Sequence, residues 1–159
     1  MSSKKIKIGL VGCGRISLKH FEAIEQYDEL DLVAVCDNDK IALDKAVKST
    51  GSNSYDDYIS FLKNDLDVVV LCTPSGLHAS QTIEAVSSGK HVVTEKPMAT
   101  LWSDGIRMVD ACKKANRQLF VVKQNRYNKT LQTLKRAILE RRFGKIYSVN
   151  INVFWTRPQ

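Results

Sequence analysis

Residues 6–17, IKIGLVGCGRIS, place a short apolar run directly before a glycine-rich turn. The run Ile6–Val11 has the length and composition of a buried strand, and the motif Gly12-x-Gly14-x-x-Ser17 follows it at once. The first glycine permits a tight turn, the second lets the backbone approach a pyrophosphate, and Ser17 stands where a glycine or alanine is usual. Because the motif opens a predicted helix, the free N–H groups and the helix dipole there suit an anion. The residues that we expect to lie against the cofactor phosphates are Gly12, Gly14, Arg15 and Ile16.

The rest of the chain repeats the alternation of apolar runs and amphipathic stretches. We expect strands at 6–11, 32–36, 68–72, 91–94 and 119–122, and helices at 15–26, 39–49, 75–88 and 102–116, with a short one at 55–63. The Val/Ile/Leu-rich strands suit a sheet that is covered on both faces. This pattern predicts an α/β fold with a doubly wound parallel sheet, the Rossmann arrangement, over residues 1–124.

Residues 125–159 have a different pattern. Leu131, Leu134 and Ile138 recur at helical spacing within 129–142, next to basic residues, which predicts a basic amphipathic helix. Strict alternation over 146–155 then predicts a long strand with one apolar face. We interpret this segment as the linking helix and first strand of a second, α+β domain that continues beyond the chain. A swapped or intermolecular sheet is the other way to cover the strand.

Bulk composition excludes several classes of protein. The 159 residues are 43% hydrophobic with ordinary charge, which is typical of a globular chain, and no apolar run approaches the length of a membrane span or a signal peptide. The four cysteines lie far apart, mostly in or beside apolar runs, and the three histidines lack ligand-like spacing. We therefore expect buried reduced thiols, no metal, no membrane and a cytoplasmic protein.

Charge is distributed unevenly along the chain. Residues 101–159 carry 13 lysines and arginines against 3 acidic residues, whereas residues 1–100 have a slight acidic excess. Such a surplus attracts anions, either phosphorylated or carboxylated small molecules or nucleic acid, unless it is only a solvated face. The basic helix has no interleaved aromatic residues on which bases could stack, so we disfavour nucleic acid.

An acidic residue follows the second predicted strand. Asp37 lies 23 residues after Gly14, where a carboxylate can accept hydrogen bonds from the hydroxyls of an adenine ribose and repel a 2′-phosphate. The next residues, Asn38-Asp39-Lys40, include no arginine, so NAD is favoured over NADP. A methyltransferase with S-adenosylmethionine could use a similar turn and acid, and it remains a minor alternative.

The third predicted strand ends in CTPSGLHA, residues 72–79. Thr73-Pro74 breaks the strand at the edge where doubly wound sheets bind ligands, and Ser75 can cap the next helix. His78 is either an ordinary surface histidine or a cofactor or substrate contact. We include Thr73, Pro74, Ser75 and His78 among the candidate cofactor residues.

The fourth predicted strand ends in HVVTEKP, residues 91–97, at the same edge. Pro97 cannot donate to a sheet and biases the preceding residue towards an extended conformation, so strand pairing stops and Lys96 can turn to a ligand. Glu95 and Lys96 are therefore candidate cofactor contacts. Lys96 is also our candidate for acid–base catalysis and for contact with the substrate.

Together, Gly12-x-Gly14, Asp37, Thr73-Pro74 with His78, and Glu95-Lys96-Pro97 resemble the glucose–fructose oxidoreductase/inositol dehydrogenase (Gfo/Idh/MocA) family. The resemblance covers essentially the whole chain. It implies a Rossmann domain followed by an α+β domain with a large open sheet, through which the full-length protein would form a homo-oligomer. It also implies a catalytic or substrate-positioning role for the lysine of the EKP motif, opposite a histidine that would lie beyond Gln159.

The stretch from Val121 to Gln159, VVKQNRYNKTLQTLKRAI…FGKIYSVNINVFWTRPQ, is similar to a subgroup of that family. This subgroup oxidises C3 of UDP-N-acetylglucosaminuronic acid on the route to bacterial surface polysaccharides. The resemblance implies that Gln124, Asn125 and Arg126 line the sugar-nucleotide pocket, Gln124 towards the cofactor. The basic surplus suits a substrate with a diphosphate and a carboxylate.

Two functions of different classes follow. The first is the NAD-binding part of a sugar-nucleotide dehydrogenase that transfers a hydride from a sugar carbon to NAD. The second is a non-catalytic dinucleotide-binding module that reports the NAD state through the basic helix or the exposed strand.

Overall fold

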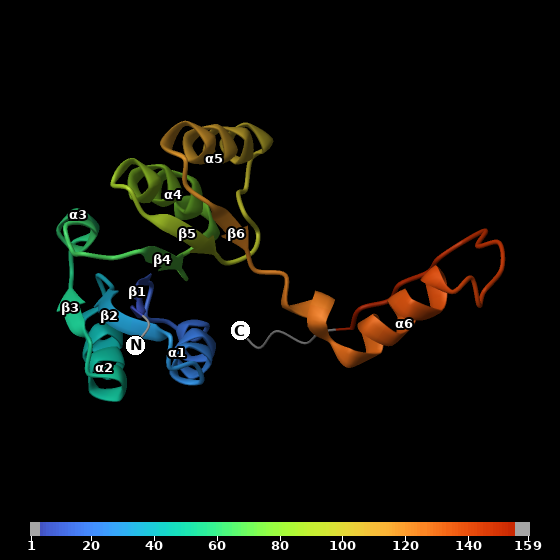
Figure 1. Cartoon of the computed structure of the whole chain (residues 1–159), viewed down its shortest axis with the longest axis horizontal. Helices are drawn as coiled ribbons and strands as arrows, with labels where there is room; N and C mark the ends of the chain where they lie inside the picture. The colour runs from blue at the N-terminus through green and yellow to red at the C-terminus, as the bar shows by residue number, and fades with distance from the viewer. Residues whose placement is uncertain (1–3, 155–159) are drawn as a thin grey trace. The chain divides into compact units, whose positions relative to one another are not determined.

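A six-stranded parallel sheet forms the centre of residues 4–122 in the computed structural model, which describes residues 4–154 (Figure 1). Its strands are β1 (Ile6–Val11), β2 (Leu30–Cys36), β3 (Asn53–Tyr55), β4 (Val68–Leu71), β5 (His91–Thr94) and β6 (Leu119–Val121). The order across the sheet is β3-β2-β1-β4-β5-β6, and every neighbouring pair is parallel. The direction of winding reverses between β1 and β4, so the predicted doubly wound Rossmann sheet is confirmed.

Helices connect the strands and cover both faces of the sheet. They are α1 (Ser17–Glu25), α2 (Lys40–Thr50), α3 (Tyr58–Leu62), α4 (His78–Ser87) and α5 (Trp102–Ala115), with a 3-10 turn, η1 (Ser75–Leu77), before α4. The apolar residues of α1 and α2 pack on one face of the sheet, and those of α3, α4 and α5 pack on the other. Each connection between parallel strands is thus a crossover, as parallel pairing requires.

The core follows from this double coverage. Leu10 in β1 is fully buried beside Ile24 of α1, whereas Val69 in β4 is fully buried on the opposite side with Phe61 of α3. Burial of one such side chain contributes about 1.5 to 3 kcal/mol relative to leaving it exposed. The near-continuous apolar composition of the strands is therefore explained, since both of their faces are buried.

The observed boundaries differ from the predicted ones in a few places. The strand β3 was missed, and the predicted helix 55–63 is the five-residue α3 that starts at Tyr58. Because β3 has only three residues at the sheet edge, none of them buried, it lacks the apolar run that marks the other strands. The predicted helix 75–88 begins as the 3-10 turn η1 before it becomes α4.

Residues from Lys123 onward form a separate unit by their contacts. This unit contains a 3-10 turn, η2 (Gln124–Tyr127), and the helix α6 (Lys129–Leu139), whose amphipathic character was expected. The border falls two residues before the predicted one, and the assignment of this unit to a second α+β domain stays a prediction.

The predicted strand at 146–155 was wrong for the described residues. The backbone between residues 145 and 154 has no strand, and Trp155 lies outside the described residues. Alternating side chains do not suffice, because a strand needs a neighbour that accepts and donates its backbone hydrogen bonds.

Within residues 4–154, no helix combines the length and the apolar composition that a bilayer span requires.

Candidate functional site

Four strands end side by side at one edge of the sheet, and a cleft opens there. Val11, Cys36, Leu71 and Thr94 are the last residues of β1, β2, β4 and β5. The cleft has a volume of about 680 Å³, within the range of small-molecule sites. Its lining comes from the ends of β1, β2 and β4 and from the segments that follow β1, β2, β3 and β4: Val11, Gly12, Gly14, Cys36, Asp37, Asn38, Asp39, Ala42, Asp56, Tyr58, Cys72, Thr73, Pro74, Leu77 and Gln81.

The two glycines of the turn have different surroundings. Gly12 has a φ of +90°, and a Cβ there would lie 2.7 Å from the carbonyl carbon of Cys72. A Cβ on Gly14 would meet no heavy atom of the described residues within 4 Å. Gly12 thus lets β1 and the end of β4 approach each other, and Gly14 leaves open space above the start of α1. That space and the amides of the helix start fit a diphosphate.

The serine in the motif is accommodated by the fold. Ser17 is fully buried, and its hydroxyl donates to the carbonyl oxygen of Gly14 at 2.6 Å. The additional polar atom is therefore satisfied within the turn itself, and α1 still starts directly after the glycines. Arg15 and Ile16 are exposed beside it, as a phosphate contact requires.

Asp37 is fixed at the lip of the cleft. Its Oδ2 accepts from the backbone N–H of Cys13 at 2.6 Å, and its Oδ1 accepts from the N–H of Asp39 at 2.8 Å. The carboxylate therefore joins the glycine-rich turn to the end of β2 and keeps its remaining lone pairs for a ligand. Asp39 and Asp56 also line the cleft, so this end of it disfavours an additional phosphate.

The segment after β4 supplies the opposite wall. Thr73 and Pro74 line the cleft, and the Thr73 hydroxyl donates to Oε1 of Gln81 on α4 at 2.6 Å. The predicted cap by Ser75 was wrong: in the described structure, its side chain makes no capping hydrogen bond to η1 or α4. The helix instead begins through the 3-10 turn, in which the backbone N–H of Leu77 donates to the carbonyl oxygen of Pro74.

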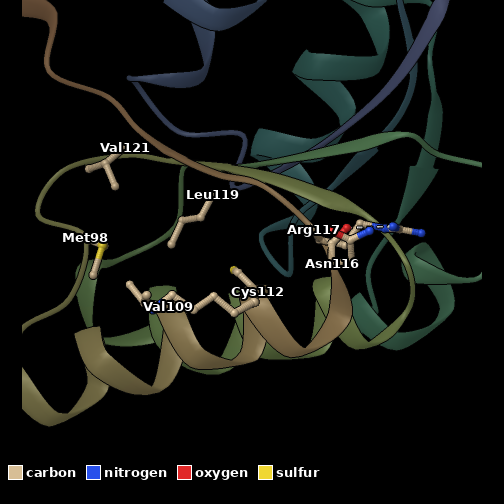
Figure 2. A pocket seen from close by; sticks show the side chains of 8 residues that line it. Met98, Val109, Cys112, Asn116, Arg117, Leu119 and Val121 are labelled. Carbon is tan, nitrogen blue, oxygen red and sulfur yellow. Dashed lines mark hydrogen bonds between the residues drawn. The ribbon is translucent and has the colours of Figure 1, made fainter.

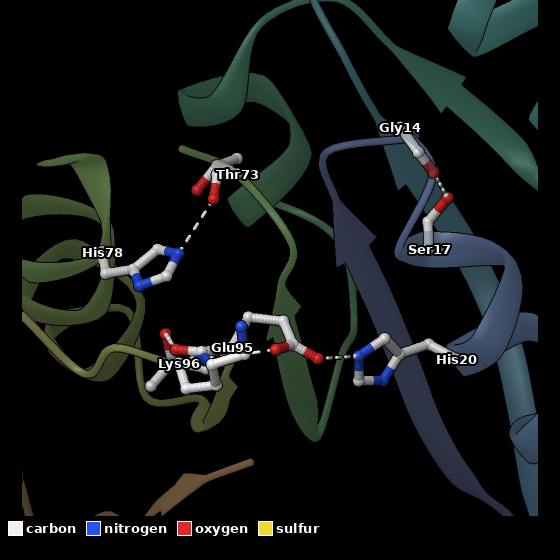
Figure 3. Close-up of polar contacts among 8 residues, drawn as sticks. Gly14, Ser17, His20, Thr73, His78, Glu95 and Lys96 are labelled. Atoms are coloured by element: carbon white, nitrogen blue, oxygen red, sulfur yellow. Dashed lines mark hydrogen bonds and ion pairs between the residues drawn. The ribbon is translucent and has the colours of Figure 1, made fainter. Parts of the chain in front are cut away.

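His78 is not a surface residue. Only 1% of it is exposed, and its ring lies between two backbone carbonyls, with Nδ1 2.8 Å from the oxygen of Pro97 and Nε2 2.9 Å from that of Thr73. The surface alternative is therefore wrong. Both ring nitrogens are occupied by the loops after β4 and β5, so His78 braces the two loops against each other (Figure 3).

Glu95 and Lys96 follow β5 and have opposite environments. Glu95 is buried, and its carboxylate contacts His20 of α1 and the backbone N–H of Lys96. The Lys96 side chain is exposed at the carboxyl edge of the sheet, next to the loop that His78 holds (Figure 3). A long, exposed amine whose backbone N–H is held by Glu95 suits contact with a substrate.

Several residues of the site carry no motif in the sequence. Asp56 and Tyr58 reach the cleft after the unpredicted strand β3, and Gln81 reaches it from the first turn of α4. His20 contacts Glu95 across 75 positions in the chain. Its place one turn after the glycine motif was the only signal in the sequence, and it was missed.

The predicted substrate residues belong to the second unit. Gln124, Asn125 and Arg126 lie in η2, a turn that precedes α6. Their roles towards cofactor and sugar stay predictions, because they rest on the resemblance.

Three thiols lie in the lining of the cleft or next to it, and they are neutral. Burial, with a smaller contribution from Asp37, raises the pKa of Cys13 to about 12, and burial likewise raises the pKa of Cys36 and of Cys72 to about 12. Thiols that stay protonated are poor nucleophiles and poor metal ligands. Among residues 4–154, no group of three or more His, Cys, Asp and Glu side chains could hold a metal ion.

A second hollow, of about 520 Å³, lies between α5 and β6 (Figure 2). Its walls are mainly apolar, with Met98, Val109 and Leu119 among them, and its polar end is formed by Lys113, Asn116 and Arg117. No carboxylate or imidazole belongs to its lining, so the larger cleft at the carboxyl edge is the candidate site.

A family model described as "Oxidoreductase family, NAD-binding Rossmann fold" (Gfo/Idh/MocA) matches residues 6–123. Among solved structures, the chain is similar to the WlbA dehydrogenase from Chromobacterium violaceum in complex with NADH and UDP-GlcNAcA. The two are 55% identical with a TM-score of 0.95, over 100% of this chain and 47% of that one. The WlbA dehydrogenase from Bordetella pertussis, in complex with the same two compounds, is 54% identical with a TM-score of 0.94, over 98% and 48% of the two chains.

A curated relative is more distant. The myo-inositol 2-dehydrogenase of Thermotoga maritima is 28% identical over 148 residues, which are 92% of this chain and 44% of that protein. The chain thus spans less than half the length of each of these relatives.

Proposed function

The chain belongs to the Gfo/Idh/MocA oxidoreductase family, and from this premise we propose that it is the NAD-binding part of a dehydrogenase for a UDP-N-acetylhexuronic acid. The observation that carries the substrate class is 55% identity over the whole chain to a dehydrogenase whose structure holds NADH and UDP-GlcNAcA. Oxidation at C3 of the sugar is part of the proposal and rests on the resemblance of residues 121–159 to that subgroup.

The cleft fits NAD by its own geometry. The open space at Gly14 and the start of α1 would take the diphosphate, and Asp37 would accept from the hydroxyls of the adenosine ribose. Thr73 and Pro74 would border the nicotinamide half, and we retain Ser75, Glu95 and Gln124 as further cofactor contacts. His78 would act through the loops that it holds.

Lys96 is the proposed catalytic residue of this chain. When NAD is bound, its nicotinamide supplies the hydride acceptor. The exposed amine of Lys96 would lie beside the sugar hydroxyl and assist removal of its proton as the hydride leaves the same carbon. Atoms and charge then balance, since one hydride and one proton leave the alcohol.

The anionic substrate agrees with the charge of the chain. The basic surplus of residues 101–159 would favour a diphosphate and a carboxylate, and Asn125 and Arg126 are the proposed contacts. We also propose homo-oligomerisation through the second domain and a reducing, cytoplasmic location, in which the free thiols would persist.

Replacement of Lys96 by Met tests the catalytic assignment. In the full-length protein, we expect K96M to bind NAD as the wild type does and to lower turnover of UDP-N-acetylglucosaminuronic acid by about 100-fold or more, because an acid–base group is lost. Cofactor reduction is followed at the nicotinamide absorbance, and NAD affinity by calorimetry. Lys63→Met, an exposed lysine at the end of α3, is the matched control. Near-normal turnover in K96M would refute the assignment. Binding of NAD without reduction by any sugar of a UDP-sugar panel would instead support the regulatory module.

A further inference from the structure

One side-chain contact joins the glycine-rich turn and α1 to the segment that carries Lys96. Nε2 of His20, on α1, lies 3.0 Å from Oε1 of Glu95, the residue before Lys96 (Figure 3). The side chains are 17% and 10% exposed, respectively, so the contact is largely shielded from water. Hydrogen bonds between partly buried, charge-bearing groups are stronger than those on the surface.

Each oxygen of the Glu95 carboxylate contacts one of the two segments. Oε1 faces His20, and Oε2 accepts from the backbone N–H of Lys96 at 3.2 Å. An ionised carboxylate only accepts, so Nε2 of His20 must carry the proton in this contact. A buried carboxylate without its partner would be costly, and Glu95 therefore depends on His20 for its position.

The position of His20 is set by the cofactor turn. α1 begins at Ser17, directly after the glycines, and His20 lies three residues later, on the first turn of the helix. His20, Glu95 and the backbone of Lys96 thus form a chain of contacts from the proposed diphosphate site to the proposed catalytic lysine. On the basis of the proposed function, we infer that His20 is a positioning residue, which acts through Glu95 to hold the backbone of Lys96 in the orientation that catalysis needs.

His20→Leu and His20→Gln separate positioning from packing. Leucine removes the donor, whereas the glutamine amide can donate from nearly the same place as Nε2. In the full-length protein, we expect H20L to lower kcat by on the order of 100-fold, as displacement of a reacting group does, with the KM for the sugar and the Kd for NADH changed by less than about 3-fold. We expect H20Q to recover kcat to within about 10-fold of the wild type. Glu25→Gln, an exposed residue at the end of α1, is the control for changes on this helix.

A second measurement does not depend on turnover. Amide exchange at Lys96, followed by NMR in the 159-residue chain, should be about 5- to 10-fold faster in H20L, the change expected for loss of one hydrogen bond. It should return towards the wild-type rate in H20Q and stay unchanged in E25Q.

The two measurements distinguish failure of the inference from failure of the proposed function. Wild-type exchange at Lys96 together with wild-type kcat in H20L would overturn the positioning role. Equal losses of kcat and of NADH binding in H20L would also overturn it, because they indicate a merely structural histidine. If no UDP-sugar is turned over by the wild type, the proposed function fails, and the exchange rates alone decide whether His20 holds Lys96.

Discussion

At the level of single residues, the two glycines of the turn contribute different properties to one site. Gly12 is in the left-handed region with no room for a side chain, because the backbone of Cys72 and Thr73 lies within 2.8 Å of a Cβ there. Gly14 is outside that region and faces open space. The first glycine therefore allows the strands to meet, and the second leaves room for a ligand.

We predict that Gly12→Ala lowers the stability of the fold, whereas Gly14→Ala weakens the binding of NAD. G12A should lower the free energy of unfolding by about 2 to 4 kcal/mol, since a clash with backbone adds to an unfavourable φ. G14A should change it by less than about 1 kcal/mol and weaken NAD binding instead, because its methyl group enters the proposed diphosphate space. Chemical denaturation and NAD titration of both variants check this. Equal free energies of unfolding for G12A and G14A would contradict the assignment of a packing role to Gly12 and a ligand-binding role to Gly14.

The sequence predicted individual residues only where local pattern sufficed. Asp37 could be placed from its distance to the glycine motif, since strand, helix and strand fix that spacing in a βαβ unit. The pairing of His20 with Glu95 and the bracing of two loops by His78 could not be placed, because each joins segments that meet only in the folded sheet. The same holds for Asp56 and Gln81, which reach the cleft from unmarked positions.

At the level of elements, the ends of the strands decide where chemistry is possible. β1, β2 and β4 each end within two residues of a cysteine, namely Cys13, Cys36 and Cys72, and the pKa of each thiol is raised. A neutral thiol lets a strand end remain apolar directly below a polar cleft. Elements with a continuous apolar run were predictable, whereas the conformations of β3 and of the segment 146–154 were not. In these two segments, the presence or absence of a hydrogen-bonding neighbour, rather than the side-chain pattern, determines whether a strand forms.

The raised thiol pKa values predict a loss of stability at alkaline pH. A group whose pKa is higher in the folded than in the unfolded chain stabilises the fold fully below the unfolded value, here 9.0, and ever less as the pH rises towards the folded value of about 12. The free energy of unfolding should therefore fall as the pH rises above about 9. Cys36→Ala should make that fall less steep, measured by urea denaturation at several pH values. Parallel curves for C36A and the wild type would show that Cys36 does not contribute.

At the level of the whole molecule, the chain consists of two units that differ in how much of their apolar surface is buried. The unit through Val122 has a core on both faces of its sheet and contains the complete cleft. The unit from Lys123 has a single α-helix in its described part, with Leu131, Leu134 and Ile138 each more than 40% exposed. Binding of the dinucleotide should therefore depend mainly on the first unit, whereas the proposed sugar contacts Asn125 and Arg126 belong to the second.

The most direct test is a titration of the chain with NAD and with NADP, by calorimetry, together with Asp37→Ser and the control Asp44→Ser, an exposed acid on α2. We predict saturable binding of NAD to the chain and to a version that ends at Val122. NADP should bind at least about 10-fold more weakly, because repulsion between the Asp37 carboxylate and the 2′-phosphate raises the Kd by more than that factor. D37S should reduce that preference, and D44S should preserve it. Absence of NAD binding, or equal affinity of the wild type for both cofactors, would contradict the assignment of the cleft.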